Sequence, residues 1–131
     1  MAERILVVDD DAHVAETMAE LLREAGYQPE TCTDSVAAFR RISEVAYDLI
    51  VSDIMMPDFD GLLLLSLIKA QTPSPEVILV TGFSTRERAR QAMTHGAFAY
   101  LEKPFDSAEL LALVRQALRK RKLAVGQDSD G

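Results

Sequence analysis

Acidic, hydroxyl and ammonium side chains directly follow four short apolar runs in this sequence. Asp9 and Asp10 follow the first run, and Asp53 follows the second. Thr81 follows the third run and Lys103 the last. If these runs are parallel strands of one open sheet, their carboxyl ends share one edge, which is where such sheets bind ligands. The sequence therefore predicts that these five side chains meet in space.

Three carboxylates and a lysine in one place favour phosphate chemistry with a divalent cation. Asp9, Asp10 and Asp53 would repel one another unless a cation joins them. Mg²⁺ prefers hard oxygen ligands, and it usually takes one or two carboxylates together with phosphate oxygens. A carboxylate beside Mg²⁺ can attack phosphorus to form an aspartyl phosphate, and Lys103 offers a compact positive charge to a phosphate oxygen. Thr81 can hydrogen-bond the new phosphoryl group, so the pattern indicates phosphoryl transfer governed by positioning and charge neutralisation.

The elements that position these residues alternate along the chain. Apolar runs rich in β-branched residues at 5–8, 49–51 and 77–80 predict buried parallel strands, with weaker strands expected around 30–32 and 99–101. Apolar residues at helical spacing predict five intervening helices. The alternation predicts an α/β fold, a doubly wound five-stranded parallel sheet of flavodoxin-like order 2-1-3-4-5. Pro29 cannot donate a ladder hydrogen bond, which suits the second strand to an edge.

Local signals mark where helices begin and end. Gly26 is expected to stop the first helix. Capping boxes are expected at 84–87 and 106–109, the second with Asp106 as the cap. Helical periodicity fades after about Lys122, so we expect one domain over residues 1–122, with 123–131 as a flexible tail or a truncated linker.

Composition narrows the class of protein. The net charge is −7, from 14 basic and 21 acidic residues, which argues against direct nucleic-acid binding by this domain. Cys32 is the only cysteine, so no internal disulfide can form. No apolar stretch is long enough to span a bilayer, and the chain begins with a strand-like segment and without a signal peptide. We expect a cytoplasmic protein with no membrane partner.

At these residues the chain resembles the receiver domain of two-component response regulators, over about residues 3 to 122. The motifs that match are Val7-Val8-Asp9-Asp10, Ser52-Asp53-Ile54-Met55-Met56-Pro57 followed by Asp60-Gly61, Val80-Thr81-Gly82, and Lys103-Pro104-Phe105. The resemblance implies a phosphorelay switch rather than an enzyme, one that assists only its own phosphorylation and dephosphorylation. Its partner would be a sensor histidine kinase or a phosphotransfer protein.

The resemblance also implies a role for each matching residue. Asp53 would accept the phosphoryl group, while Asp10 would bind Mg²⁺ directly and Asp9 largely through water. The backbone carbonyl of Met55 would be a further ligand. Thr81 and Lys103 would contact the phosphoryl group. Tyr100 matches an aromatic switch position coupled to Thr81, and the output surface would be the fourth helix, fifth strand and fifth helix, through which a homodimer could form.

Two other functions compete with this interpretation. One is an aspartate-dependent phosphatase of the haloacid dehalogenase type, although His13 stands where that class has Thr or Val and the chain leaves no room for a cap domain. The other is a receiver-like binding module that is not phosphorylated. Met55 and Phe83 line the expected mouth of the site, and because both are apolar, neither side chain can orient a hydrolytic water, which predicts a long-lived phosphoryl group.

Overall fold

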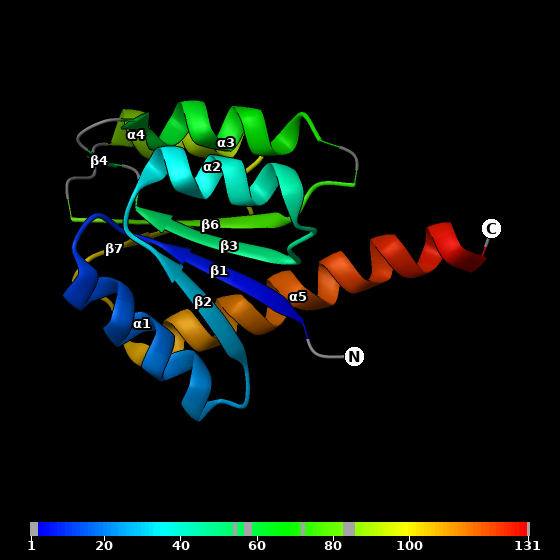
Figure 1. The fold of residues 1–131 in the computed structure, drawn as a ribbon, viewed down its shortest axis with the longest axis horizontal. Coiled ribbons are helices and arrows are strands. Elements are labelled where there is room, and N and C mark those ends of the chain that lie inside the picture. The colour runs from blue at the N-terminus through cyan, green and yellow to red at the C-terminus, as the bar shows by residue number, and fades with distance from the viewer. Residues whose placement is uncertain (1–2, 54, 57–58, 72, 83–85, 131) are drawn as a thin grey trace.

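Five strands of the computed structural model form one parallel sheet at the centre of the molecule (Figure 1). The structure describes residues 3–53, 55–56, 59–71, 73–82 and 86–130. The sheet has the order β2-β1-β3-β6-β7, which is 2-1-3-4-5 when its strands are counted along the chain. Its strands are β1 (Arg4–Val8), β2 (Gln28–Cys32), β3 (Leu49–Asp53), β6 (Glu76–Thr81) and β7 (Ala99–Glu102). All five predicted strands and their order are confirmed.

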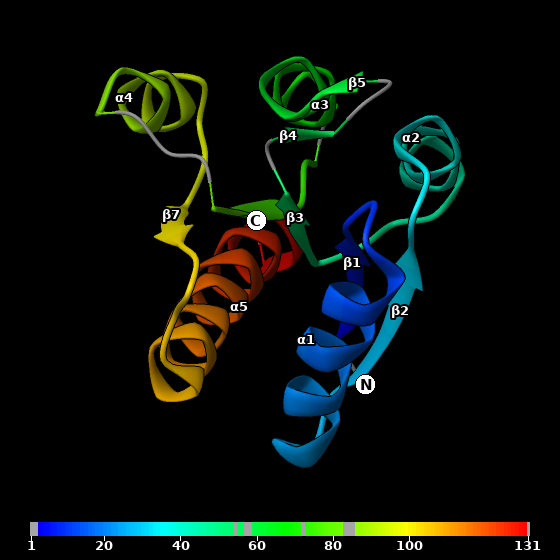
Figure 2. The ribbon, with the colours of Figure 1, turned by 90° about the vertical axis from the view of Figure 1, so that its left-hand side faces the viewer.

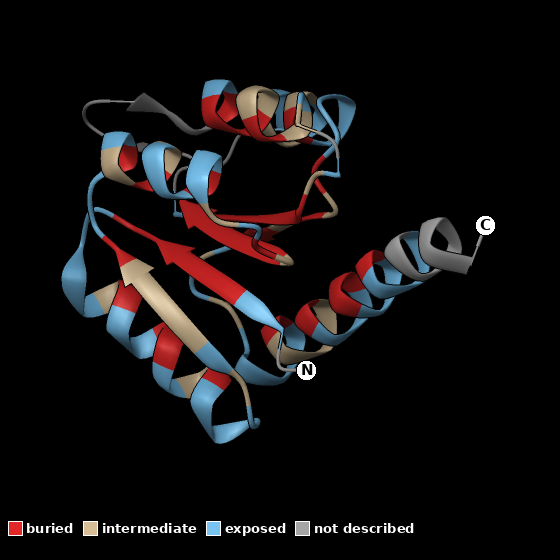
Figure 3. Ribbon diagram, turned by 45° about the vertical axis from the view of Figure 1, so that its right-hand side comes forward, coloured by how far each residue is buried: buried red, intermediate tan, exposed pale blue. Residues whose placement is uncertain are grey.

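The strand sequences account for this order. Every residue of β3 and of β6 is buried, as expected for central strands covered on both faces. The strand β2 pairs only with β1 among the described residues, so Pro29 lies on an edge strand as its missing N–H requires. Figure 3 shows the same contrast, with the inner strands buried and β2 largely intermediate.

Helices cover both faces of the sheet. The helices α1 and α5 lie side by side on one face, while α2, α3 and α4 cover the other (Figure 2). Their bounds are α1 (Ala12–Glu24), α2 (Ser35–Glu44), α3 (Gly61–Lys69), α4 (Arg86–Thr94) and α5 (Ser107–Asp130). Two apolar cores follow from this layering, one between the sheet and each layer of helices.

The predicted stop at Gly26 and the predicted cap at Asp106 are observed, without the reciprocal Glu109 contact of a full capping box among the described residues. Gly26 follows α1 with a φ of +99°, a left-handed conformation that favours glycine. Asp106 accepts a hydrogen bond from the backbone N–H of Ala108, so it caps the start of α5. The capping box at 84–87 includes residues outside the described part of the chain.

Two features differ from the sequence-based expectations. A short antiparallel pair, β4 (Met55–Met56) and β5 (Phe59–Asp60), follows β3 and was not predicted, because two-residue strands carry no periodic signal. The helix α5 continues to Asp130, beyond the expected end near Lys122. Helix-favouring residues such as Lys122, Leu123 and Ala124 can propagate a helix without an apolar face to bury. That the domain itself ends at 122 stays a prediction.

Candidate functional site at the carboxyl edge of the sheet

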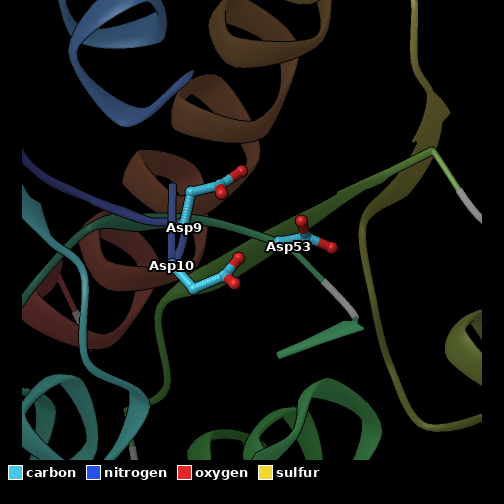
Figure 4. Close-up of side chains that lie close together, drawn as sticks. All are labelled: Asp9, Asp10 and Asp53. Atoms are coloured by element: carbon cyan, nitrogen blue, oxygen red, sulfur yellow. The ribbon is translucent and has the colours of Figure 1, made fainter. Parts of the chain in front are cut away.

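Three carboxylates meet beyond the carboxyl ends of β1 and β3 (Figure 4). Carboxylate oxygens from Asp9, Asp10 and Asp53 all lie within 4.8 Å of one another. Asp9 is 1% exposed and Asp53 7%, whereas Asp10 is exposed. The strands β1 and β3 are paired in register, with Val8 beside Ser52, which brings residues following each strand to the same level of the sheet. The predicted meeting of these side chains is therefore observed.

Lys103 supplies a positive charge to this cluster. Its Nζ donates hydrogen bonds to Asp9 Oδ2 at 2.9 Å and to Asp53 Oδ2 at 3.1 Å. Burial would lower the pKa of Lys103, but its hydrogen bonds and charge interactions with the two carboxylates outweigh burial and raise it above the usual value. Lys103 is therefore a fixed cation at neutral pH, and it bridges the two buried carboxylates.

Backbone contacts hold these residues in place. The N–H of Asp9 donates to the carbonyl of Cys32 at 3.1 Å, and Asp9 Oδ1 accepts from the N–H of Asp11 at 3.0 Å. Asp11 in turn accepts from the N–H groups of His13 and Val14, which makes it the cap of α1 as the sequence predicts. Asp9 thus has one oxygen bound to the turn and the other bound to Lys103.

Thr81 and Tyr100 lie on one face of the sheet. Tyr100 pairs in register with Leu79, two residues before Thr81 on β6, so the three side chains point to the same side. Thr81 is fully buried, and Tyr100 is partly buried against the core beneath α3 and α4. The N–H of Lys103 donates to the carbonyl of Thr81 at 2.8 Å, which continues the ladder beyond β7.

Two predicted positions are less fully described. Met55 begins β4, directly beyond β3, and a role for its carbonyl stays a prediction. Phe83 lies outside the described residues.

The Asp9–Lys103 ion pair was not anticipated from the sequence. The resemblance assigns Lys103 to the phosphoryl group, yet its ammonium also contacts Asp9. The available signal was a lysine and an acidic residue following different strands of one parallel sheet. Lys103 is joined to Pro104 by a cis peptide bond.

Within the described residues, no helix has the length and apolar character needed to cross a membrane. The cytoplasmic location stays a prediction.

Comparisons with known proteins agree with the fold and show the family. A family model described as the response regulator receiver domain matches residues 5–115. The response regulator protein FleR of Pseudomonas aeruginosa is 36% identical over 132 residues, covering 100% of this chain and 27% of FleR. The chain spans about a quarter of the length of the first curated relatives it matches.

Solved receiver domains share the architecture. A CheY-like receiver domain protein from Methanospirillum hungatei superposes with a TM-score of 0.87 at 28% identity, covering 95% of this chain and 99% of that one. The beryllofluoride-activated NtrC4 receiver domain dimer gives 0.84 at 35% identity, covering 90% and 98%. The family match spans most of the chain and does not favour a phosphatase or a module of another class. This chain belongs to the family of response regulator receiver domains.

Proposed function

We propose that Asp53 accepts a phosphoryl group from a histidine kinase or phosphotransfer protein, and that Mg²⁺ is required. The observation that carries this proposal is the meeting of Asp9, Asp10 and Asp53 within 4.8 Å, with Lys103 bonded to Asp53. Carboxylate oxygens at this density are the donors that Mg²⁺ prefers. Family membership supports the same assignment.

Asp53 is suited to act as the nucleophile. Asp53 is the last residue of the buried central strand β3, and its Oδ2 accepts a hydrogen bond from Lys103 Nζ. One of its carboxylate oxygens would attack the phosphorus of the donor, forming an O–P bond as the bond from phosphorus to the phosphohistidine nitrogen breaks. The electron pair of the broken bond stays on the imidazole. No proton need be removed from the nucleophile, because a carboxylate is already charged.

The metal would be held by oxygen ligands from this chain. Asp10 would coordinate the metal directly, which its exposed side chain beside the buried pair supports. Asp9 would contact the metal through water, because its oxygens already accept hydrogen bonds from Asp11 and Lys103. The Met55 carbonyl is the remaining protein ligand proposed. Bound Mg²⁺ would offset the repulsion between the carboxylates and the incoming phosphoryl oxygens.

Lys103 and Thr81 would bind the transferred group. The Nζ of Lys103 now donates to an oxygen of Asp53, and it would shift one of its three donors to a phosphoryl oxygen. Thr81, at the carboxyl end of the neighbouring strand, would donate a hydrogen bond from its hydroxyl group to another phosphoryl oxygen. A phosphoryl group adds roughly −1.5 to −2 charge and three acceptor oxygens, which both residues complement.

The signal would leave through the surface formed by α4, β7 and α5. Tyr100 on β7 lies beside Leu79 and on the face shared with Thr81, so a movement of Thr81 changes the space available to the ring. The NtrC4 receiver domain, a relative, was solved as a dimer in its beryllofluoride-activated form, which supports a phosphorylation-dependent homodimer here. Phosphorylation would act by shifting an existing equilibrium between two conformations. The output and regulated process belong to a larger protein or to a separate partner.

The decisive experiment is chemical phosphorylation followed by mapping of the modified residue. The protein is incubated with acetyl phosphate and Mg²⁺, and the acyl phosphate is located by mass spectrometry after reduction with borohydride. We expect modification at Asp53, none in Asp53→Asn, and none when EDTA replaces Mg²⁺. Glu44→Gln, which alters an exposed carboxylate on α2, is the matched control and should be modified like the wild type. Full labelling of Asp53→Asn at another residue would overturn the assignment.

A further inference from the structure

Two rows of charge lie on neighbouring helices on one face of the sheet. The helix α1 presents Glu20 and Glu24, which are four residues apart and therefore share a side of the helix. The helix α5 presents Arg115, Arg119 and Lys122 at i, i+4 and i+7. All five side chains are exposed. Figure 2 shows these two helices side by side below the sheet.

These five charges have no ion-pair partner among the residues that the structure describes. Other charges on the same helices do have one, since Arg23 pairs with Glu16 and Lys120 pairs with Glu76. The acidic row on α1 and the basic row on α5 are thus available to charges from outside the chain.

The two rows are complementary to each other in sign, and the acidic row is the shorter one. Glu20 to Glu24 spans about 6 Å along its helix, and Arg115 to Lys122 spans about 10 Å. A two-fold axis running between α1 and α5 would place the acidic row of one chain against the basic row of the other, and would do so twice. Such an isologous contact closes with two chains.

We propose that the face formed by α1 and α5 binds a second copy of this chain through these two rows. Charge complementarity identifies the occupant. A polyanion such as nucleic acid would be drawn to α5 but repelled by the adjacent Glu20 and Glu24, and a polycation would meet the reverse. Only a partner carrying both signs in matching order satisfies both rows, and a second copy carries them by symmetry.

This contact differs from the phosphorylation-dependent surface of α4, β7 and α5. It requires no phosphoryl group and uses α1, which that surface does not include. Both surfaces use α5, so the two contacts would compete for that helix. The acidic row on α1 therefore provides the diagnostic substitutions.

Sedimentation velocity tests the contact on the unphosphorylated protein in EDTA, from about 20 μM to about 1 mM, the range of weak pairing. We expect concentration-dependent dimers at low salt that dissociate as salt screens the charges. The double variant Glu20→Lys, Glu24→Lys should weaken association about tenfold or more. The reversal Arg115→Glu, Arg119→Glu should do the same. The single variant Glu44→Lys, on the opposite face of the sheet, should leave association unchanged.

The critical sample combines both reversals in one chain. This fourfold variant has the wild-type net charge, and its basic α1 row now faces two acidic positions on α5, so dimers should return. A mixture of the two double variants should also pair, although each variant alone does not. In the heterodimer the basic α1 of one variant faces the altered, acidic α5 of the other, and the basic α5 of the first faces the acidic α1 of the second. A mixture that stays monomeric would count against the proposal. Circular dichroism establishes that every variant is folded before association is scored. A wild type that remains monomeric at low salt, an α1 reversal without effect, or a fourfold variant that fails to pair would each overturn the proposal.

Discussion

Removal of the Asp10 carboxylate should stabilise the metal-free domain and abolish its stabilisation by Mg²⁺. The exposed side chain of Asp10 stands within 4.8 Å of Asp9 and Asp53, and Lys103 contributes a single compensating charge. Three negative charges and one positive charge leave the metal-free cluster with an excess of two negative charges. The variant Asp10→Ala removes one of them without disturbing a buried contact.

The size of the effect follows from Coulomb's law. Two unit charges about 5 Å apart interact by about 0.8 kcal/mol in water and by about 3.3 kcal/mol at an effective dielectric constant of 20. The lower figure applies to Asp10 because its side chain is exposed. Two repulsions are lost together with one attraction to Lys103, so we expect Asp10→Ala to gain about 1 kcal/mol in EDTA. For a domain of this size that raises the melting temperature by roughly 4 °C.

Mg²⁺ should stabilise the wild type much more than it stabilises Asp10→Ala. At 100 times its dissociation constant, a ligand that binds only the folded state stabilises it by about 2.7 kcal/mol, or roughly 10 °C here. Wild type should gain this increment, and Asp10→Ala should lose most of it.

Thermal unfolding followed by circular dichroism, at constant ionic strength, measures both effects. Glu44→Ala removes an equally exposed carboxylate from α2 and should behave as wild type in both conditions. The reasoning is refuted if Asp10→Ala keeps the full Mg²⁺ increment, or if it is less stable than wild type in EDTA.

Three further predictions concern residues that stabilise the fold, one in the site and two away from it. Lys103→Met in EDTA should lower the free energy of unfolding in urea by about 2 kcal/mol, because two buried carboxylates lose their cation. Since the pKa of Lys103 is raised, the stability that it contributes is complete below about pH 10.4 and is lost only as pH rises through the raised pKa. A difference between wild type and variant that already narrows as pH rises from neutral to about 9 would contradict this. Glu76→Gln should lower the free energy of unfolding by about 1–3 kcal/mol, because this buried carboxylate forms ion pairs with both Lys69 and Lys120. Lys120→Ala should lower it by less than about 1 kcal/mol, because that lysine is mostly exposed. Equal losses for the two variants in urea unfolding would argue against this distinction. Gly26→Ala should lower the free energy of unfolding by about 1 kcal/mol, since its φ of +99° is strained for alanine, and an unchanged melting temperature would count against this.

The sheet was predictable because its signals are local and mutually consistent. Runs such as Val77 to Val80 are apolar on both faces, and a chain cannot expose them to water at low cost. Pro29 places its strand at an edge by the loss of a single donor. The β4–β5 pair and the continuation of α5 were not predictable in the same way. Two-residue strands depend on the turn between them, and helix ends are the part of a helix that a sequence pattern specifies least sharply.

The members of the site were predictable, but their contacts were not. Sequence places Asp9, Asp53 and Lys103 after particular strands, and parallel pairing brings those strand ends together. Which oxygen each side chain uses depends on the turns that follow. The N–H of Asp11 occupies one oxygen of Asp9, so the other oxygen is the one bonded to Lys103. Which oxygen accepts each hydrogen bond depends on tertiary geometry, and residue spacing in the sequence does not predict it.

The position of Lys103 has a consequence for how the site would communicate with β7. Its ammonium is bonded to Asp53, while its own backbone N–H donates to the carbonyl of Thr81. Tyr100 stands three residues earlier, on β7 and on the same face as Thr81. A phosphoryl group on Asp53 would draw on the Lys103 ammonium and the Thr81 hydroxyl together, and these two residues are already joined by one backbone hydrogen bond. The rearrangement would therefore reach β7 through this backbone hydrogen bond, and we expect the Tyr100 side chain, on the face shared with Thr81, to respond to it.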